Sequence, residues 1–164
     1  KGIIEDLTFD EIRQNYRLLD GGVVPSFEEV LELNAGRSLI VTELKVYRKN
    51  YKKLAKAALP VLSKIQDKKS MALISFDPRA LIRVRKTGMA TALLLVKEHI
   101  WVWHFRHLFD SIDIDKRIVS CPKVCRYRKK HIVNVWTLEN EQEYEAAKPY
   151  ADAFTFQHFK PNCK

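Results

Sequence analysis

The sequence predicts an α/β fold in which parallel strands alternate with helices. Short apolar runs of strand length are separated by segments whose apolar residues recur at helical spacing. Strands that alternate with helices indicate a parallel sheet with right-handed crossovers. With 164 residues, 46% of them apolar and 30% charged, residues 1–164 can form a single domain with its own core.

The first clear element is a helix that begins after Pro25. Ser26 is the predicted N-cap and Glu29 occupies the third helical position, which together form a capping box. A turn at Gly21-Gly22 precedes this helix, and a loop around Ala35-Gly36 follows it.

The first predicted strand, Leu39–Lys45, ends in a charged pair. Residues two apart in a strand share a face, so Glu43 and Lys45 point the same way. Charged groups at the carboxyl end of a buried strand are costly to desolvate unless they bind something. The partner could be each other, a metal or an anionic ligand, and a plain structural ion pair remains an equal alternative.

Five further strands and five helices follow in alternation. The predicted strands are Met71–Ser75, Thr91–Val96, Ser111–Ile114, Ile132–Trp136 and Ala151–Thr155. The predicted helices are Tyr51–Ile65, with a kink or early break at Pro60; Asp77-Pro78 to a stop at Gly88; Trp101–Phe109; the second half of Val119–Lys130; and a helix capped by Asn140 with Glu143 reaching back.

Six βα units suit a (β/α) barrel, but the chain is short for one. A complete eight-unit barrel usually needs about 250 residues and at least about 200. We therefore predict an incomplete TIM-type barrel of about six βα units. Its two open parallel edges would need a second copy of the chain or a complementing segment to close them.

Several motifs occur in the order found in one enzyme family. They are Pro25 to Leu31, Glu43-Leu44-Lys45, Ser75-Phe76-Asp77-Pro78, Val133 to Thr137, and Tyr150 to Phe154. In these motifs the chain resembles the glycerophosphodiester phosphodiesterases, hydrolases of lipid metabolism. The resemblance implies that the six strands are the third to the eighth of the barrel. The segment Lys1 to Asn15 then resembles the one that follows the second strand.

The resemblance implies a metal-dependent hydrolysis that yields glycerol 3-phosphate and an alcohol. The family's two catalytic histidines lie in His-Arg-Gly and His-Asp motifs, and two of its three metal ligands lie in Glu-x-Asp. None of the five histidines here is followed by Arg-Gly or Asp, so no catalytic residue is assigned. Glu43 matches the third metal ligand and Lys45 matches the lysine that holds the substrate phosphate. A Mg²⁺ or Ca²⁺ ion would thus bind the complete family site, but weakly or not at all to this chain alone.

Three more residues are candidates for the substrate pocket. The family places a tryptophan at Trp136, which shares a strand face with Asn134, and Phe76 follows the end of its strand. A barrel-core aromatic is the alternative for Trp136. The loop Thr155 to Pro161 departs from the family's Thr-Asp-x-Pro.

Three functions therefore remain open. The chain is a phosphodiesterase-like protein that is inactive alone, a non-catalytic barrel remnant that binds phosphate ligands or a protein, or a basic nucleic-acid-binding domain. The third rests on a net charge of +9 and on the basic clusters at Arg79 to Lys86 and Lys123 to Lys130. Such clusters are more often solvated helix faces, so nucleic acid is the least favoured partner.

The remaining features predict a cytoplasmic protein. Neither a membrane-spanning run nor a signal peptide is visible in the sequence, although a processed, exported chain would also lack a signal. The three cysteines, Cys121, Cys125 and Cys163, are too few for a disulfide framework.

Overall fold

The computed structural model describes residues 3–162. Contacts divide the chain into two compact units, Lys1–Ser38 and Leu39–Lys164, which are described separately. That residues 1–164 form a single domain stays a prediction.

The first unit holds two capped helices. A short 3-10 helix, η1 (Ile4–Asp6), precedes α1 (Phe9–Asn15) and α2 (Phe27–Asn34). Ser26 and Glu29 form a capping box at α2, which confirms the predicted helix start. Thr8 and Glu11 form the same motif at α1, where the sequence analysis did not identify it.

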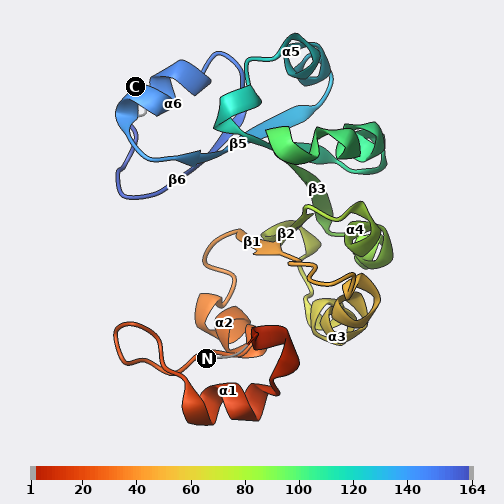
Figure 1. The fold of residues 1–164 in the computed structure, drawn as a ribbon, viewed down its shortest axis with the longest axis vertical. Coiled ribbons are helices and arrows are strands. Elements are labelled where there is room, and N and C mark those ends of the chain that lie inside the picture. The colour runs from red at the N-terminus through yellow and green to blue at the C-terminus, as the bar shows by residue number, and fades with distance from the viewer. Residues whose placement is uncertain (1–2, 163–164) are drawn as a thin grey trace. The chain divides into compact units, whose positions relative to one another are not determined.

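The second unit is a six-stranded sheet in which all neighbours are parallel (Figure 1). Its strands are β1 (Ile40–Glu43), β2 (Met71–Ser75), β3 (Ala90–Leu95), β4 (Ser111–Asp115), β5 (Ile132–Leu138) and β6 (Ala153–Phe156). They follow one another in chain order, so β1 and β6 form the two edges. The sheet is curled, and the predicted incomplete (β/α) barrel is confirmed.

Helices connect consecutive strands along one face of the sheet (Figure 1). The α-helices are α3 (Tyr51–Lys64), α4 (Pro78–Val84), α5 (Pro122–Arg128) and α6 (Glu141–Ala147). The 3-10 helices are η2 (Lys68–Ser70), η3 (Arg85–Thr87), η4 (Lys97–Leu108) and η5 (Lys116–Ile118).

The core lies between the sheet and these helices. Alternate strand residues on the helix side are fully buried, such as Leu73, Leu93, Ile112 and Val133. The opposite, concave face is partly open, and Val41 keeps 55% of its surface exposed. Because apolar residues occupy both faces, the strands read as near-continuous apolar runs.

One predicted helix and the early break considered at Pro60 differ from the structure. The helix expected over Trp101–Phe109 is a 3-10 helix that begins at Lys97, with non-helical backbone angles at His99. This segment mixes tryptophan, valine, phenylalanine and histidine, which are poor helix formers, and no side chain caps its start. The helix with Pro60 does not break there but runs to Lys64. Pro60 lies near the carboxyl end, where the Ser63 hydroxyl donates to its carbonyl at 2.8 Å.

The basic segment around α5 has the predicted orientation. Val124 and Tyr127 are buried, and Arg126, Lys129 and Lys130 are exposed, so the charges form a solvated helix face.

No helix within residues 3–162 is both long and apolar enough to cross a membrane. Cys121 and Cys125 are free thiols, and Cys163 lies outside the described residues.

Candidate functional site

The candidate site is the concave face at the carboxyl ends of the strands, where parallel barrels carry their sites. Strand register determines which side chains gather there. Glu43 pairs with Ile74, Asp113 with Asn134, and Asp115 with Trp136. Residues paired in this way lie on the same face of adjoining strands.

Glu43 and Lys45 lie on this face, whereas Leu44 between them is buried on the helix side. The Lys45 ammonium is 3.5 Å from a Glu43 carboxylate oxygen, and the lysine side chain is 77% exposed. An exposed pair at this distance contributes little to stability. The ammonium is therefore accessible to an anion from solvent.

Phe76 and Trp136 are in contact across the concave face. Their ring centroids are 5.7 Å apart and the rings are nearly perpendicular, at 81°. Phe76 follows β2 and Trp136 lies in β5, so curvature of the sheet brings together side chains from strands separated by β3 and β4. The Trp136 indole N–H is buried and has no acceptor within the described part of the chain.

Asp113 is a site residue that the sequence analysis missed. It is only 5% exposed, and its neighbour Asn134 donates a hydrogen bond to it. Burial raises the pKa of Asp113 to about 6, and the Asn134 hydrogen bond opposes that rise. The Asn134 amide also donates to the Thr155 hydroxyl at 3.1 Å, which links β5 to β6.

Asp115, also missed, forms a charged cluster with Arg117 and Glu98. The Arg117 guanidinium donates to both Asp115 oxygens at 2.6–3.0 Å and to both Glu98 oxygens at 2.7 and 2.9 Å. Burial raises the pKa of Asp115, but hydrogen bonds from Arg117 outweigh it and hold the pKa below its usual range. Asp115 is therefore a paired, ionised carboxylate.

A sequence signal for both aspartates exists. In Ser111-Ile112-Asp113-Ile114-Asp115 the isoleucines alternate with polar residues, which places both carboxylates on one face of the strand. The isoleucines are fully buried on the helix side, so the carboxylates face the concave side.

Glu43 is the carboxylate that the family resemblance assigns to a divalent cation. Residues 3–162 contain no group of three or more histidine, cysteine, aspartate or glutamate side chains placed to hold a metal ion. Glu43 contributes one carboxylate, and Lys45 lies against it. Since Ca²⁺ takes six to eight oxygens and Mg²⁺ an octahedron, these residues fit only a part of such a site.

The comparisons with known proteins identify the fold. No family model matches the sequence, and no curated protein does. Solved structures do match. An Oleispira antarctica phosphodiesterase in complex with its product sn-glycerol-3-phosphate superimposes with a TM-score of 0.77 at 20% identity, covering 94% of this chain and 68% of that one.

Two further structures agree. A putative glycerophosphodiester phosphodiesterase from Galdieria sulphuraria gives a TM-score of 0.76 at 15% identity over 95% of this chain and 68% of that one. A glycerophosphodiester phosphodiesterase from Parabacteroides distasonis gives 0.74 at 19% identity, with 91% and 66% covered. The chain thus spans about two thirds of the length of these proteins.

The chain therefore has the fold of a glycerophosphodiester phosphodiesterase barrel, with part of that barrel outside it. The family resemblance in the sequence motifs is confirmed at the level of the fold. The roles of Glu43, Lys45, Phe76, Asn134 and Trp136 remain predictions.

Proposed function

We propose that the concave face binds the glycerol phosphate part of a glycerophosphodiester, and that this chain alone does not hydrolyse it. The observation that carries the proposal is the accessible Lys45 ammonium at the carboxyl end of β1. It lies on the face where Phe76 and Trp136 are in contact. The Oleispira antarctica phosphodiesterase of the same fold holds sn-glycerol-3-phosphate.

Each side chain has a proposed role. Lys45 contacts the phosphate as a point charge, and the faces of Phe76 and Trp136 contact the glycerol carbons. Asn134 lies two residues before Trp136 on the same face of β5, and its amide oxygen can accept from a substrate hydroxyl, since its N–H groups donate to Asp113 and Thr155. Glu43 supplies one carboxylate toward a divalent cation, which in a complete site would polarise the phosphoryl oxygen.

The parent reaction, hydrolysis to glycerol 3-phosphate and an alcohol, needs groups that this chain does not supply. A general acid and a general base contribute about 10²–10⁴-fold each. Residues that complete the site would come from a complementing segment or a second subunit that pairs with the β1 and β6 edges. Reading the gene upstream of the Lys1 codon tests this: an encoded His-Arg-Gly motif supports the enzyme, whereas an upstream stop codon favours a non-catalytic binding module.

Binding is tested directly with sn-glycerol-3-phosphate and the purified chain by titration calorimetry. We expect Lys45→Gln to weaken binding about tenfold, which corresponds to the loss of one charge-assisted hydrogen bond. Lys129→Gln removes another exposed cation, just after α5, and serves as the matched control. If both variants bind like the original chain, Lys45 does not hold the phosphate and the proposal fails.

A further inference from the structure

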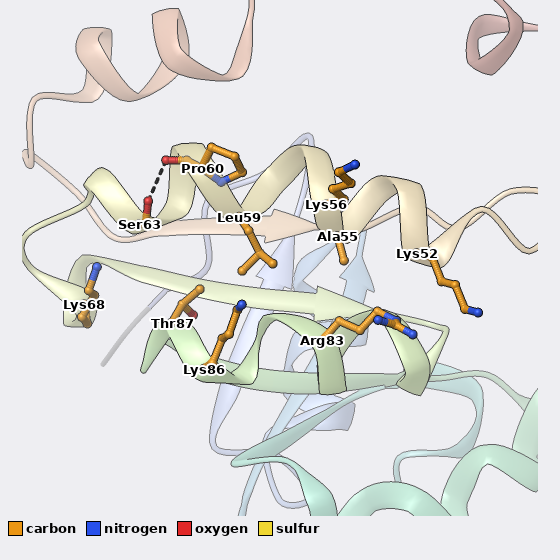
Figure 2. Close-up of a pocket in the computed structure, with 10 residues that line it drawn as sticks. All are labelled: Lys52, Ala55, Lys56, Leu59, Pro60, Ser63, Lys68, Arg83, Lys86 and Thr87. Atoms are coloured by element: carbon orange, nitrogen blue, oxygen red, sulfur yellow. Dashed lines mark hydrogen bonds between the residues drawn. The ribbon is translucent and has the colours of Figure 1, made fainter.

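A second hollow lies on the helix side of the sheet, between α3 and the segment formed by α4 and η3 (Figure 2). Its volume is about 930 Å³. All its residues fall between Lys52 and Thr87, within the second unit. We call it the α3–α4 groove, and none of the site residues described above lines it.

The floor of the groove is apolar. Ala55 is 1% exposed, and Leu59 points from α3 toward α4 (Figure 2). Pro60 extends the same surface toward the carboxyl end of α3. An apolar group of a ligand can therefore lie against this floor.

The walls are cationic. Five lining residues are lysine or arginine: Lys52, Lys56, Lys68, Arg83 and Lys86. Among the described residues, no aspartate or glutamate lines the groove. Lys68 is already engaged, because its ammonium donates to the carbonyls of Leu62 and Ile65. Lys52, Arg83 and Lys86 have no carboxylate partner within residues 3–162.

Tyr51 positions the guanidinium of Arg83. The Arg83 guanidinium carbon lies 5.5 Å from the centre of the Tyr51 ring. Arg79 contacts the same ring at 4.3 Å, but its charge is paired with Asp77 at 2.6 Å. Figure 2 shows the Lys86 side chain pointing toward Leu59, and the Arg83 guanidinium extending along the groove toward its Lys52 end.

We propose that the α3–α4 groove binds a small phosphate-bearing anion that also carries an apolar group. The unpaired cations bind the phosphate oxygens, and Ala55 and Leu59 pack against the apolar group. The volume falls within the range of about 300–1,000 Å³ that is usual for small-molecule sites. An acidic helix from a partner protein fits less well, because α4 (seven residues) and η3 (three residues) together are only about 16 Å long.

The test uses 1-naphthyl phosphate as the probe, with inorganic phosphate and 1-naphthol as its two halves, titrated into the purified chain. We expect 1-naphthyl phosphate to bind at least about tenfold more tightly than either half. The reason is that only the whole probe contacts both the cationic walls and the apolar floor. Inorganic phosphate binding as tightly as 1-naphthyl phosphate would show that the floor takes no part, and would overturn the proposal.

Charge variants locate the site. We expect Lys52→Gln/Lys86→Gln to weaken the naphthyl phosphate complex roughly tenfold, since two cations are lost. Lys129→Gln/Lys130→Gln removes the same charge just after α5 and should leave the affinity unchanged. Equal weakening in the two double variants would reveal unspecific attraction to a basic chain and refute the groove. Lys45→Gln should have no effect on the binding of 1-naphthyl phosphate. The groove proposal and the concave-face proposal are therefore tested by different variants, and either can fail without the other.

An experiment with lipid vesicles distinguishes a lipid headgroup from a free phosphate ester as the source of the phosphate. Phosphatidylcholine vesicles with and without phosphatidic acid are sedimented with the chain. Binding that requires phosphatidic acid and is lost in Lys52→Gln/Lys86→Gln assigns the groove to a lipid headgroup, whereas binding of the soluble probe alone assigns it to a free phosphate ester. Absence of binding in both arms overturns the proposal, as does tighter binding of a synthetic acidic helical peptide at the groove.

Discussion

Phe76 and Trp136 meet edge to face over the concave surface, although sixty residues and two intervening strands separate them. This contact between distant strands follows from the curvature of a parallel sheet whose neighbouring strands are twisted.

We expect Phe76→Ala to lower the free energy of unfolding by about 0.5–1.5 kcal/mol beyond the loss of its burial, because the ring contact disappears. Phe105→Ala is the matched control, since Phe105 is 38% exposed against 37% for Phe76 and has no ring contact among the described residues. Urea denaturation of both variants measures the difference. Equal losses would mean that the Phe76–Trp136 contact adds nothing.

Asp113 should make stability depend on pH in an unusual direction. Its folded-state pKa of about 6 lies above the ordinary aspartate value, so the folded chain holds this proton more tightly than the unfolded chain. Its contribution is therefore fully present below about pH 4 and is lost as pH rises through about 6. The loss is on the order of 3 kcal/mol for a shift of this size.

Asp113→Asn separates the pH-dependent contribution of Asp113 to stability from the contributions of the other carboxylates. The amide keeps the shape but does not ionise, so we expect the variant to match the original chain near pH 4 and to be more stable above pH 6. Urea denaturation at several pH values gives the difference curve. A flat difference curve across this range would contradict a raised pKa at Asp113.

The elements of the fold were largely predictable, because each strand and helix carries local signals. The capping box at Ser26 and the apolar run at Met71–Ser75 appear in the structure at the predicted residues. The site was less predictable. The contact of Phe76 with Trp136 depends on sheet curvature, and the burial of Asp113 depends on neighbours in β3 and β5, none of which the sequence of one strand reveals.

Arg117 should matter for stability through Asp115, which is 7% exposed. We expect Arg117→Met to cost about 1–3 kcal/mol, because the buried Asp115 carboxylate loses its guanidinium partner and keeps the hydrogen bond from the backbone N–H of residue 117. The double variant Asp115→Asn/Arg117→Met should recover part of this loss, and Glu98→Gln should cost less than about 1 kcal/mol because that pair is exposed. A double-mutant cycle from thermal unfolding measures the coupling, and additive losses would show that the two residues act separately.

The purified chain should not hydrolyse glycerophosphocholine when Mg²⁺ or Ca²⁺ is added. The concave face offers Glu43 but no histidine in the family's motifs, so both proton-transfer steps lack their groups. Choline release is the measurement. Metal-dependent turnover that disappears in Glu43→Gln would contradict this prediction and would direct attention to His104, His107 and His158 as replacement acids and bases.

The exposed cations in and just after α5 should attract nucleic acid only through general charge. Val124 and Tyr127 are buried, so the outward face offers Arg126, Lys129 and Lys130 without an exposed aromatic residue between them on which a base could stack. Contacts to phosphates alone weaken steeply with salt, so we expect weak binding of duplex or single-stranded DNA that collapses between about 50 and 200 mM salt. Fluorescence anisotropy with labelled oligonucleotides measures it. Tight binding that survives 200 mM salt and is lost in Arg126→Ala/Arg128→Ala would instead make α5 a nucleic-acid-binding element, and would place that function above the phosphate-binding ones.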